Sequence, residues 1–169
     1  KVIMPTRTWV TTANPALLVG AQVCLVDCEK SKPTLDANLI EDFICKETKL
    51  IVPVHLNGVA ANIDMVNCIA QKYGITVIED AAQGLFSMNK QRYLGTISRF
   101  GCFSLGMAKI ISTGQGGFVV AREKNDYEKL RLIRNQGVLD SKHDFLSSTK
   151  GLNFKFTDIQ AVICLEQMK

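Results

Sequence analysis

The stretch Met65–Asp80, M-V-N-C-I-A-Q-K-Y-G-I-T-V-I-E-D, changes from a helical to an extended pattern of apolar residues. Its first part repeats at the spacing of one helix face, through Met65, Val66, Ile69 and Tyr73. Gly74 suits the left-handed cap of that helix. Thr76–Glu79 is rich in β-branched residues and leads to a carboxylate, Asp80. A helix followed directly by a strand predicts one repeat of a layered α/β domain.

The same alternation continues on both sides of this stretch. Further strands are predicted at Val2–Met4, Gln22–Asp27, Leu50–Leu56, Phe100–Leu105 and Gly117–Ala121. Pro53 breaks the third of these, which implies an edge of the sheet or the end of the strand. Further helices are predicted after Asp36, through Tyr127, Leu130 and Ile133, and from Thr157, where Thr157-x-x-Gln160 fits a capping box. We therefore expect an α/β fold, a three-layer sandwich with a mostly parallel sheet. The polar stretch Ser141–Lys150 is expected to be a mobile loop.

Three polar residues fall at or near the downstream ends of predicted strands: His55, Asp80 and Ser104. Ligands of parallel α/β sheets bind beyond these carboxyl ends, so we treat that edge as the candidate site. A lone histidine is more often a hydrogen-bonded structural residue than a base, which is the preferred interpretation of His55.

Lys109 lies between Ser104 and a glycine-rich turn, Thr113–Gly117. A lysine amine, a hydroxyl and a carboxylate near strand ends could together hold a pyridine aldehyde phosphate. The amine of Lys109 would form an imine, the hydroxyl of Ser104 would bind the phosphate, and the carboxylate of Asp80 would keep the ring nitrogen protonated.

Each of these residues also has a structural interpretation. Asp80 could cap a helix that begins at Ala81, and Lys109 could be a solvated surface residue. The glycines of Thr113–Gly117 match neither dinucleotide nor P-loop patterns, so a tight turn between two strands is the better reading. Trp9, the single tryptophan, could stack on a planar ligand or pack in the core.

Composition restricts the remaining classes of function. The chain has 169 residues, 47% of them hydrophobic and 21% charged, with a net charge of +4. Basic residues are scattered rather than clustered, which argues against nucleic-acid binding. No apolar run is long enough to cross a bilayer. The six cysteines form no C-x-x-C pair, so no metal site is expected, and buried free thiols in a reducing cytosol are the preferred state.

Taken in order, these segments resemble the DegT/StrS family of sugar aminotransferases, which use pyridoxal phosphate. The similarity runs through Val2–Trp9, Gly20-Ala21, Pro53–Gly58, Ile78–Gln83, Phe103–Gly117 and Gly151–Lys155. The pair E-D-A-A-Q and F-S-x-x-x-x-K-x-x-x-T-G-x-G-G is its most specific part. The resemblance implies the large-domain fold of aspartate aminotransferase.

The resemblance also implies a role for each site residue. Lys109 would hold the cofactor and later move a proton, and Asp80 would pair with the pyridine nitrogen. Ser104 would bind the phosphate, Trp9 would stack on the ring, and Gln83 would lie near the ring oxygen. Asn153 would reach the cofactor phosphate of a neighbouring subunit, which implies a homodimer with shared active sites. The substrates would be an amino-acid donor, typically glutamate, and a nucleotide-linked keto-sugar, in the cytoplasm.

The chain departs from the family pattern at several points. Ile110 stands where asparagine is common, Gln115 where glutamate is usual, and Lys155 where arginine is frequent. Residues 1–169 would form the central part of a large domain, without its N-terminal segment and small C-terminal domain. Two alternatives remain: a truncated or degenerate non-catalytic domain that self-associates, and a pyridoxamine-dependent sugar dehydratase. Lys109 argues against the dehydratase, in which the lysine is replaced.

Overall fold

The computed structural model describes residues 1–138, 147 and 149–169. They form two compact units: residues 1–104 with 117–120, and residues 105–116 with 121–169. The first unit holds the sheet and the second holds two helices and the glycine-rich turn. Most of the predicted polar loop, 141–150, lies outside the described residues.

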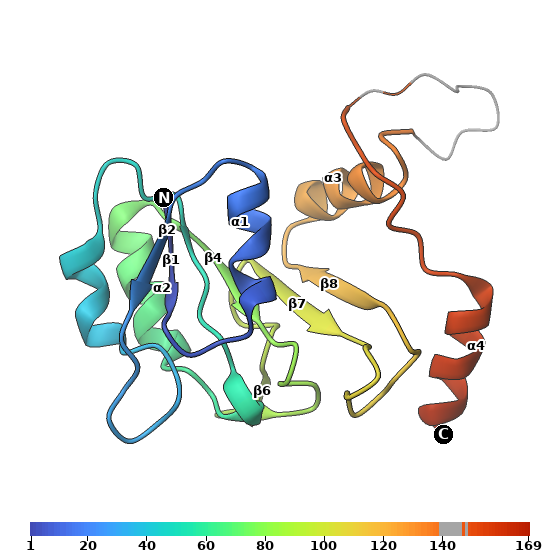
Figure 1. Ribbon diagram of the computed structural model, residues 1–169, viewed down its shortest axis with the longest axis horizontal. Coiled ribbons are helices and arrows are strands. Elements are labelled where there is room, and N and C mark those ends of the chain that lie inside the picture. Colours follow the sequence, from blue (N-terminus) through green and yellow to red (C-terminus); the bar gives the residue numbers. More distant parts are fainter. Residues whose placement is uncertain (139–146, 148) are drawn as a thin grey trace. The chain divides into compact units, whose positions relative to one another are not determined.

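A six-stranded sheet organises the first unit, in the order β2-β1-β3-β4-β7-β8 (Figure 1). Its strands are β1 (Val2–Pro5), β2 (Val23–Val26), β3 (Leu50–Ile51), β4 (Thr76–Asp80), β7 (Phe100–Ser104) and β8 (Gly117–Ala121). The pairs β1–β2, β1–β3, β3–β4 and β4–β7 are parallel, which confirms the predicted sheet. β3 ends before Pro53, which has no amide hydrogen, so the expected break there marks the end of the strand and not an edge of the sheet. Val54 nevertheless forms an isolated bridge with Asp80.

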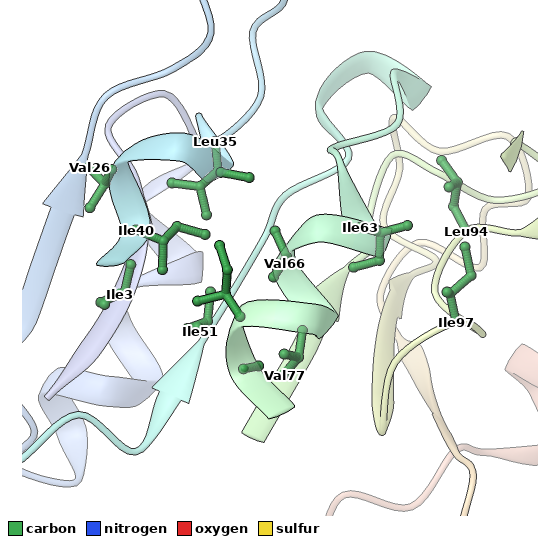
Figure 2. Packing of buried hydrophobic residues seen from close by; sticks show 13 residues of the cluster. Ile3, Val26, Leu35, Ile40, Ile51, Ile63, Val66, Val77, Leu94 and Ile97 are labelled. Atoms are coloured by element: carbon green, nitrogen blue, oxygen red, sulfur yellow. The ribbon is translucent and has the colours of Figure 1, made fainter. Parts of the chain in front are cut away.

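Apolar side chains cover both faces of this sheet, which confirms the layered architecture. The larger core joins Ile3, Ile51 and Val77 of the strands to the helix α2 (Ile63–Tyr73) through Val66 and Ile69 (Figure 2). Each such side chain contributes about 1.5–3 kcal/mol when it is fully withdrawn from water. On the other face, a smaller cluster packs Val2, Met4 and Val52 against Ala16 of the short helix α1 (Asn14–Leu18).

Both ends of α2 are capped: Gly74 as predicted, and Asn62 at an N-terminus for which no cap was predicted. The Asn62 side chain accepts a hydrogen bond from the amide of Met65 at the N-terminus. Gly74 caps the C-terminus with a φ of 64°, a left-handed conformation that glycine adopts without steric cost. These caps end the helix just before β4, so they help to fix the register of that strand.

The segment after Asp36 differs from the expected α-helix. Asp36 caps it as predicted, but η2 (Ala37–Phe43) is a 3₁₀ helix. Three residues per turn put Ala37, Ile40 and Phe43 on one side of this helix, where the first two are buried and Phe43, at its end, is partly exposed. The apolar spacing in the sequence did not distinguish the two helix types.

Several short elements were not predicted. They are η1 (Val10–Thr12), α1, η3 (Leu56–Gly58) and the hairpin of β5 (Met88–Asn89) and β6 (Arg92–Tyr93). The hairpin turn carries Lys90 and Gln91 at φ of 49° and 64°, where hairpins usually have asparagine or glycine. The usual turn signal is therefore missing from the sequence. Ion pairs from Lys90 and Arg92 to Asp64 tie the hairpin to α2.

The second unit contains α3 (Lys124–Arg134) and α4 (Asp158–Gln167). The capping box of α4 is present as predicted, with Thr157 and Gln160 bonded to each other's backbone amides. None of the helices in the described part of the chain is long and apolar enough to cross a membrane. Nor do the described residues contain a cluster of metal-binding side chains.

All six cysteines are free, as expected, but the expectation that they are buried is wrong. Cys45 and Cys68 are exposed and the other four are half-buried. Cys68 lies on α2 beside a buried residue, Ile69, and one step along a helix rotates the side chain away from the core.

We expect Gln91→Gly to raise the free energy of unfolding by about 0.5–1 kcal/mol, because glycine adopts a positive φ without a Cβ clash. The matched control is Gln71→Gly in α2, where glycine should lower stability by about 1 kcal/mol. Urea unfolding followed by circular dichroism measures both. Changes of the same sign in the two variants would contradict the left-handed turn.

Candidate active site

The candidate site begins with Asp80, the last residue of β4. One carboxylate oxygen, Oδ2, accepts a hydrogen bond from Thr12 Oγ1 at 2.7 Å, and the other accepts from the Ala82 amide at 3.1 Å. The chain after Asp80 forms a turn, so the alternative that Asp80 caps a helix is wrong. The half-buried carboxylate is thus held in one orientation, and no described residue forms an ion pair with it.

Trp9 lies on the segment that reaches Asp80. Its carbonyl accepts the amide of Thr12 at 3.0 Å, and the Thr12 hydroxyl also lies 2.7 Å from Thr8 Oγ1. Because Thr12 bonds to both Trp9 and Asp80, the structure brings these two predicted residues to the same edge of the sheet. The indole is 71% exposed within the described residues, so the core-packing alternative for Trp9 is wrong.

Gln83 lies in the turn that follows Asp80. Its Oε1 accepts a 2.7 Å hydrogen bond from the backbone amide of Asn57, which has a left-handed φ of 56°. This contact ties the loop after β4 to η3, the loop after β3. The Gln83 side chain is exposed and therefore accessible to a ligand at this edge.

Ser104 ends β7, the strand beside β4. Cys102 pairs in register with Asp80, which puts Ser104 just beyond it at the carboxyl edge, as predicted. Burial and, to a smaller extent, the nearby Asp80 carboxylate raise the pKa of the Cys102 thiol to about 11. Cys102 is therefore a neutral thiol at physiological pH and cannot act as a thiolate nucleophile.

Lys109 and Asn153 belong to the second unit. Lys109 is half-buried, and its amide donates to the Gly106 carbonyl at 3.1 Å. Around it, the glycine-rich turn closes through a 2.9 Å bond from the Leu105 amide to the Gly116 carbonyl. That Lys109 shares a pocket with Asp80 stays a prediction.

Asn153 is exposed and pairs with Asn135 in an antiparallel bridge. Its Oδ1 accepts from the Lys155 amide at 3.3 Å, and the Lys155 ammonium bonds Asn135 Oδ1 at 3.2 Å. These contacts order the segment that the resemblance assigns to a neighbouring subunit's cofactor. The role of Asn153 itself stays a prediction.

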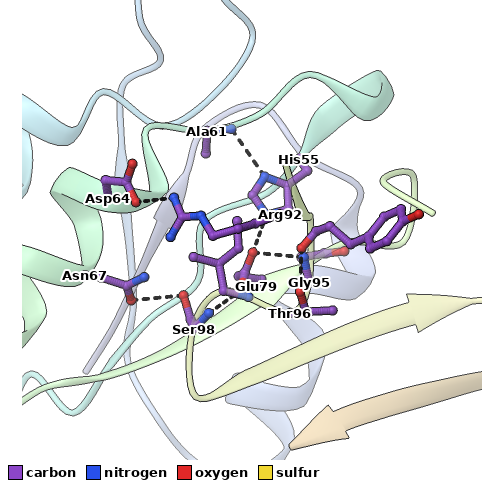
Figure 3. Close-up of polar contacts among 12 residues, drawn as sticks. His55, Ala61, Asp64, Asn67, Glu79, Arg92, Gly95, Thr96 and Ser98 are labelled. Atoms are coloured by element: carbon purple, nitrogen blue, oxygen red, sulfur yellow. Dashed lines mark hydrogen bonds and ion pairs between the residues drawn. The ribbon is translucent and has the colours of Figure 1, made fainter. Parts of the chain in front are cut away.

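Glu79 is a residue whose importance sequence reasoning missed. Its carboxylate is fully buried and accepts hydrogen bonds from His55 Nε2 at 2.9 Å and from the Gly95 and Ile97 amides at 2.9 and 2.8 Å (Figure 3). The amide of Ser98 also donates to it. A charged residue at an inward position of an apolar strand, two residues after Val77, was the available signal.

The histidine in this network is fully buried and hydrogen-bonded on both ring nitrogens. His55 Nδ1 accepts the Ala61 amide at 3.2 Å, so Nε2 carries the proton that His55 donates to Glu79. This confirms the structural interpretation of His55. Burial alone would raise the pKa of Glu79, but the hydrogen bonds from His55, Ser98 and Gly95 outweigh it and hold that pKa below its usual value.

Comparison with known proteins gives the family. The model of the DegT/DnrJ/EryC1/StrS aminotransferase family matches residues 1–169. The chain belongs to this family. It is 34% identical over 169 residues to GDP-perosamine synthase of Caulobacter vibrioides, covering 100% of this chain and 45% of that protein. It is also 34% identical over 170 residues to a Streptomyces kanamyceticus protein assigned as an L-glutamine:3-amino-2,3-dideoxy-scyllo-inosose aminotransferase, of which it covers 41%.

Solved structures agree with this assignment to the DegT/DnrJ/EryC1/StrS family. DesV of S. venezuelae superposes with a TM-score of 0.92 at 32% identity, over 99% of this chain and 44% of that one. A Streptococcus pneumoniae protein assigned as a sugar aminotransferase, in its pyridoxal-phosphate form, gives 0.91 at 25% identity, over 99% and 48%. Aminotransferases of this family depend on pyridoxal phosphate. The chain spans less than half the length of these relatives.

We expect Glu79→Gln to lower the free energy of unfolding at pH 7 by roughly 2–4 kcal/mol, because the buried donors lose a charged acceptor. Since folding lowers the pKa of Glu79, its contribution is present above the ordinary carboxyl pKa and disappears as the pH falls through the lowered value. Urea unfolding between pH 7 and pH 3 should therefore show a smaller loss of stability on acidification in Glu79→Gln than in the wild type. The exposed Glu41→Gln is the control and should change stability little at pH 7.

Proposed function

We propose that the protein carrying this chain is a pyridoxal-phosphate-dependent aminotransferase. It would take the amino group of an amino acid, with glutamate as the expected donor, and transfer it to a keto-sugar linked to a nucleotide. The family supports the reaction class, and the name of the Caulobacter relative supports a nucleotide-linked product.

The orientation of Asp80 is the observation that carries this proposal. A pyridinium nitrogen needs an anionic acceptor that is directed and not already neutralised by a protein cation. Asp80 is fixed by Thr12 and Ala82 and forms no ion pair within the described residues. The residues at this edge therefore fit the cofactor.

The other predicted site residues would hold the cofactor or move protons. Trp9 would stack on the ring, Gln83 would lie near the ring oxygen, and the Ser104 hydroxyl would bind the phosphate. When bound, pyridoxal phosphate supplies an electron sink for the amino-acid carbon. The Lys109 amine would hold the cofactor and act as the base that moves the proton.

We also propose that two copies of the protein share their active sites. Asn153 would then bind the cofactor phosphate of the neighbouring subunit, for which its exposed position is suitable. The two alternatives, a non-catalytic domain and a pyridoxamine-dependent dehydratase, both imply that Lys109 does not react with the cofactor. A test of Lys109 therefore separates them from the proposed enzyme.

We expect the protein mixed with pyridoxal phosphate to show the absorption band of lysine-bound cofactor, and borohydride to fix the cofactor on Lys109. Peptide mass spectrometry locates the modified residue. Lys109→Ala should lose both the band and the label, whereas Lys129→Ala, an exposed lysine of α3, should keep them. A band that persists in Lys109→Ala would refute the assignment.

We expect Asp80→Ala to slow transamination by at least about a hundredfold, because the ring nitrogen loses the carboxylate that keeps it protonated. Ser104→Ala should instead mainly weaken cofactor affinity, which excess pyridoxal phosphate restores. Steady-state rates at saturating cofactor, together with the cofactor dissociation constant, separate the two effects. Normal turnover in Asp80→Ala would show that the assigned site is wrong.

A further inference from the structure

A polar cleft opens in the first unit, beside the carboxyl ends of β1 and β2. Its volume is about 790 Å³, and Arg7, Asp27, Lys30, Lys32 and Asn57 line part of it. This volume lies within the usual range of small-molecule sites, roughly 300–1,000 Å³. We propose that this cleft binds the diphosphate and the ribose of the acceptor. The inference rests on the proposed function and assigns nucleotide recognition to these residues.

Three cationic side chains in the cleft have no polar contact within the described part of the chain. Arg7, Lys30 and Lys32 are exposed, and none of their side chains forms a hydrogen bond or an ion pair with another described residue. The Lys32 backbone amide alone donates to the Glu29 carbonyl, at 3.4 Å. A guanidinium binds two phosphate oxygens at once, and ammonium groups bind phosphate as point charges. Their donors are therefore available for a diphosphate.

The carboxylates of the cleft show which kind of anion fits. The Asp36 carboxylate accepts a hydrogen bond from the Asn38 backbone amide at 3.0 Å, and the Glu29 carboxylate accepts one from the Thr34 hydroxyl at 3.4 Å. Asp27 has no side-chain partner among the described residues and can accept hydrogen bonds from hydroxyl groups. Because these three carboxylates balance the three cationic side chains, the cleft does not attract every anion. It suits a ligand with both phosphates and sugar hydroxyls.

One wall of the cleft leads directly to the proposed cofactor edge. Arg7 is followed by Thr8, whose hydroxyl lies 2.7 Å from that of Thr12, and Thr12 in turn donates to Asp80. The chain that supplies a phosphate-binding cation thus also orients the carboxylate assigned to the cofactor. A ligand in the cleft can extend toward Asp80 along this segment.

The opposite wall makes a similar connection through Asn57. This residue lines the cleft, and its amide donates to Gln83 Oε1 at 2.7 Å. The cleft, Asp80 and Gln83 are therefore parts of one continuous edge of the sheet in the first unit. This continuity favours a nucleotide-linked acceptor, as the name of GDP-perosamine synthase indicates for that relative, over an inosose without a nucleotide.

Calorimetric titration of the cofactor-free protein with UDP, GDP and dTDP, and with the three matching nucleosides, tests the inference. At least one diphosphate should bind, and its nucleoside should bind at least about tenfold more weakly, because the phosphates supply most of the contacts. Arg7→Ala and the double variant Lys30→Ala/Lys32→Ala should each weaken diphosphate binding about tenfold or more. Arg7→Lys should keep part of the affinity, and Lys46→Ala, an exposed lysine outside the cleft, should keep all of it.

Three results would overturn the inference: no diphosphate binds, the cleft variants bind it as the wild type does, or the variants weaken nucleoside and diphosphate binding equally. Borohydride labelling of Lys109, measured on the same proteins, separates this inference from the proposed function. Labelling without diphosphate binding removes the cleft assignment alone. Diphosphate binding without labelling keeps the cleft and removes the proposed transfer reaction.

Discussion

The buried carboxylate of Glu79 is the constraint on which the carboxyl edge of the sheet depends. It carries a negative charge inside an apolar layer, and an unpaired charge there would cost several kcal/mol. Its donors are His55 and the amides of Gly95, Ile97 and Ser98, which come from two loops distant in sequence. Both loops must close on β4 to satisfy this charge, so the end of the strand is held from two sides.

β4 directs the neighbouring carboxylates of Glu79 and Asp80 to opposite faces of the sheet. Successive side chains of a strand point to opposite faces, so Glu79 and Val77 turn toward the buried side while Asp80 turns the other way, toward Thr12. Glu79 is fully satisfied by protein donors, whereas Asp80 keeps the capacity to bind a cation. Two residues of the same chemistry therefore take different tasks, one structural and one proposed for the cofactor.

The parallel direction of the strands explains why so many polar residues meet at one edge. β1, β2, β4 and β7 all end there, and the loops that follow carry Trp9, Lys30, Gln83 and Arg7. DesV, at 32% identity, shares this scaffold with a TM-score of 0.92. A scaffold held by its buried layers leaves these loops free to differ, which is how one fold accommodates different acceptors.

The sequence by itself determined the elements with local signals: the strands of the six-stranded sheet, the cap of α2 at Gly74, the capping box at Thr157 and the position of Asp80 at a strand end. Tertiary structure alone decided the Glu79–His55 contact, the orientation of Asp80 by Thr12, and the cleft. The reason is distance along the chain. Caps and periodicity depend on residues a few positions apart, whereas these contacts join residues 24 and 68 positions apart, which no local pattern encodes.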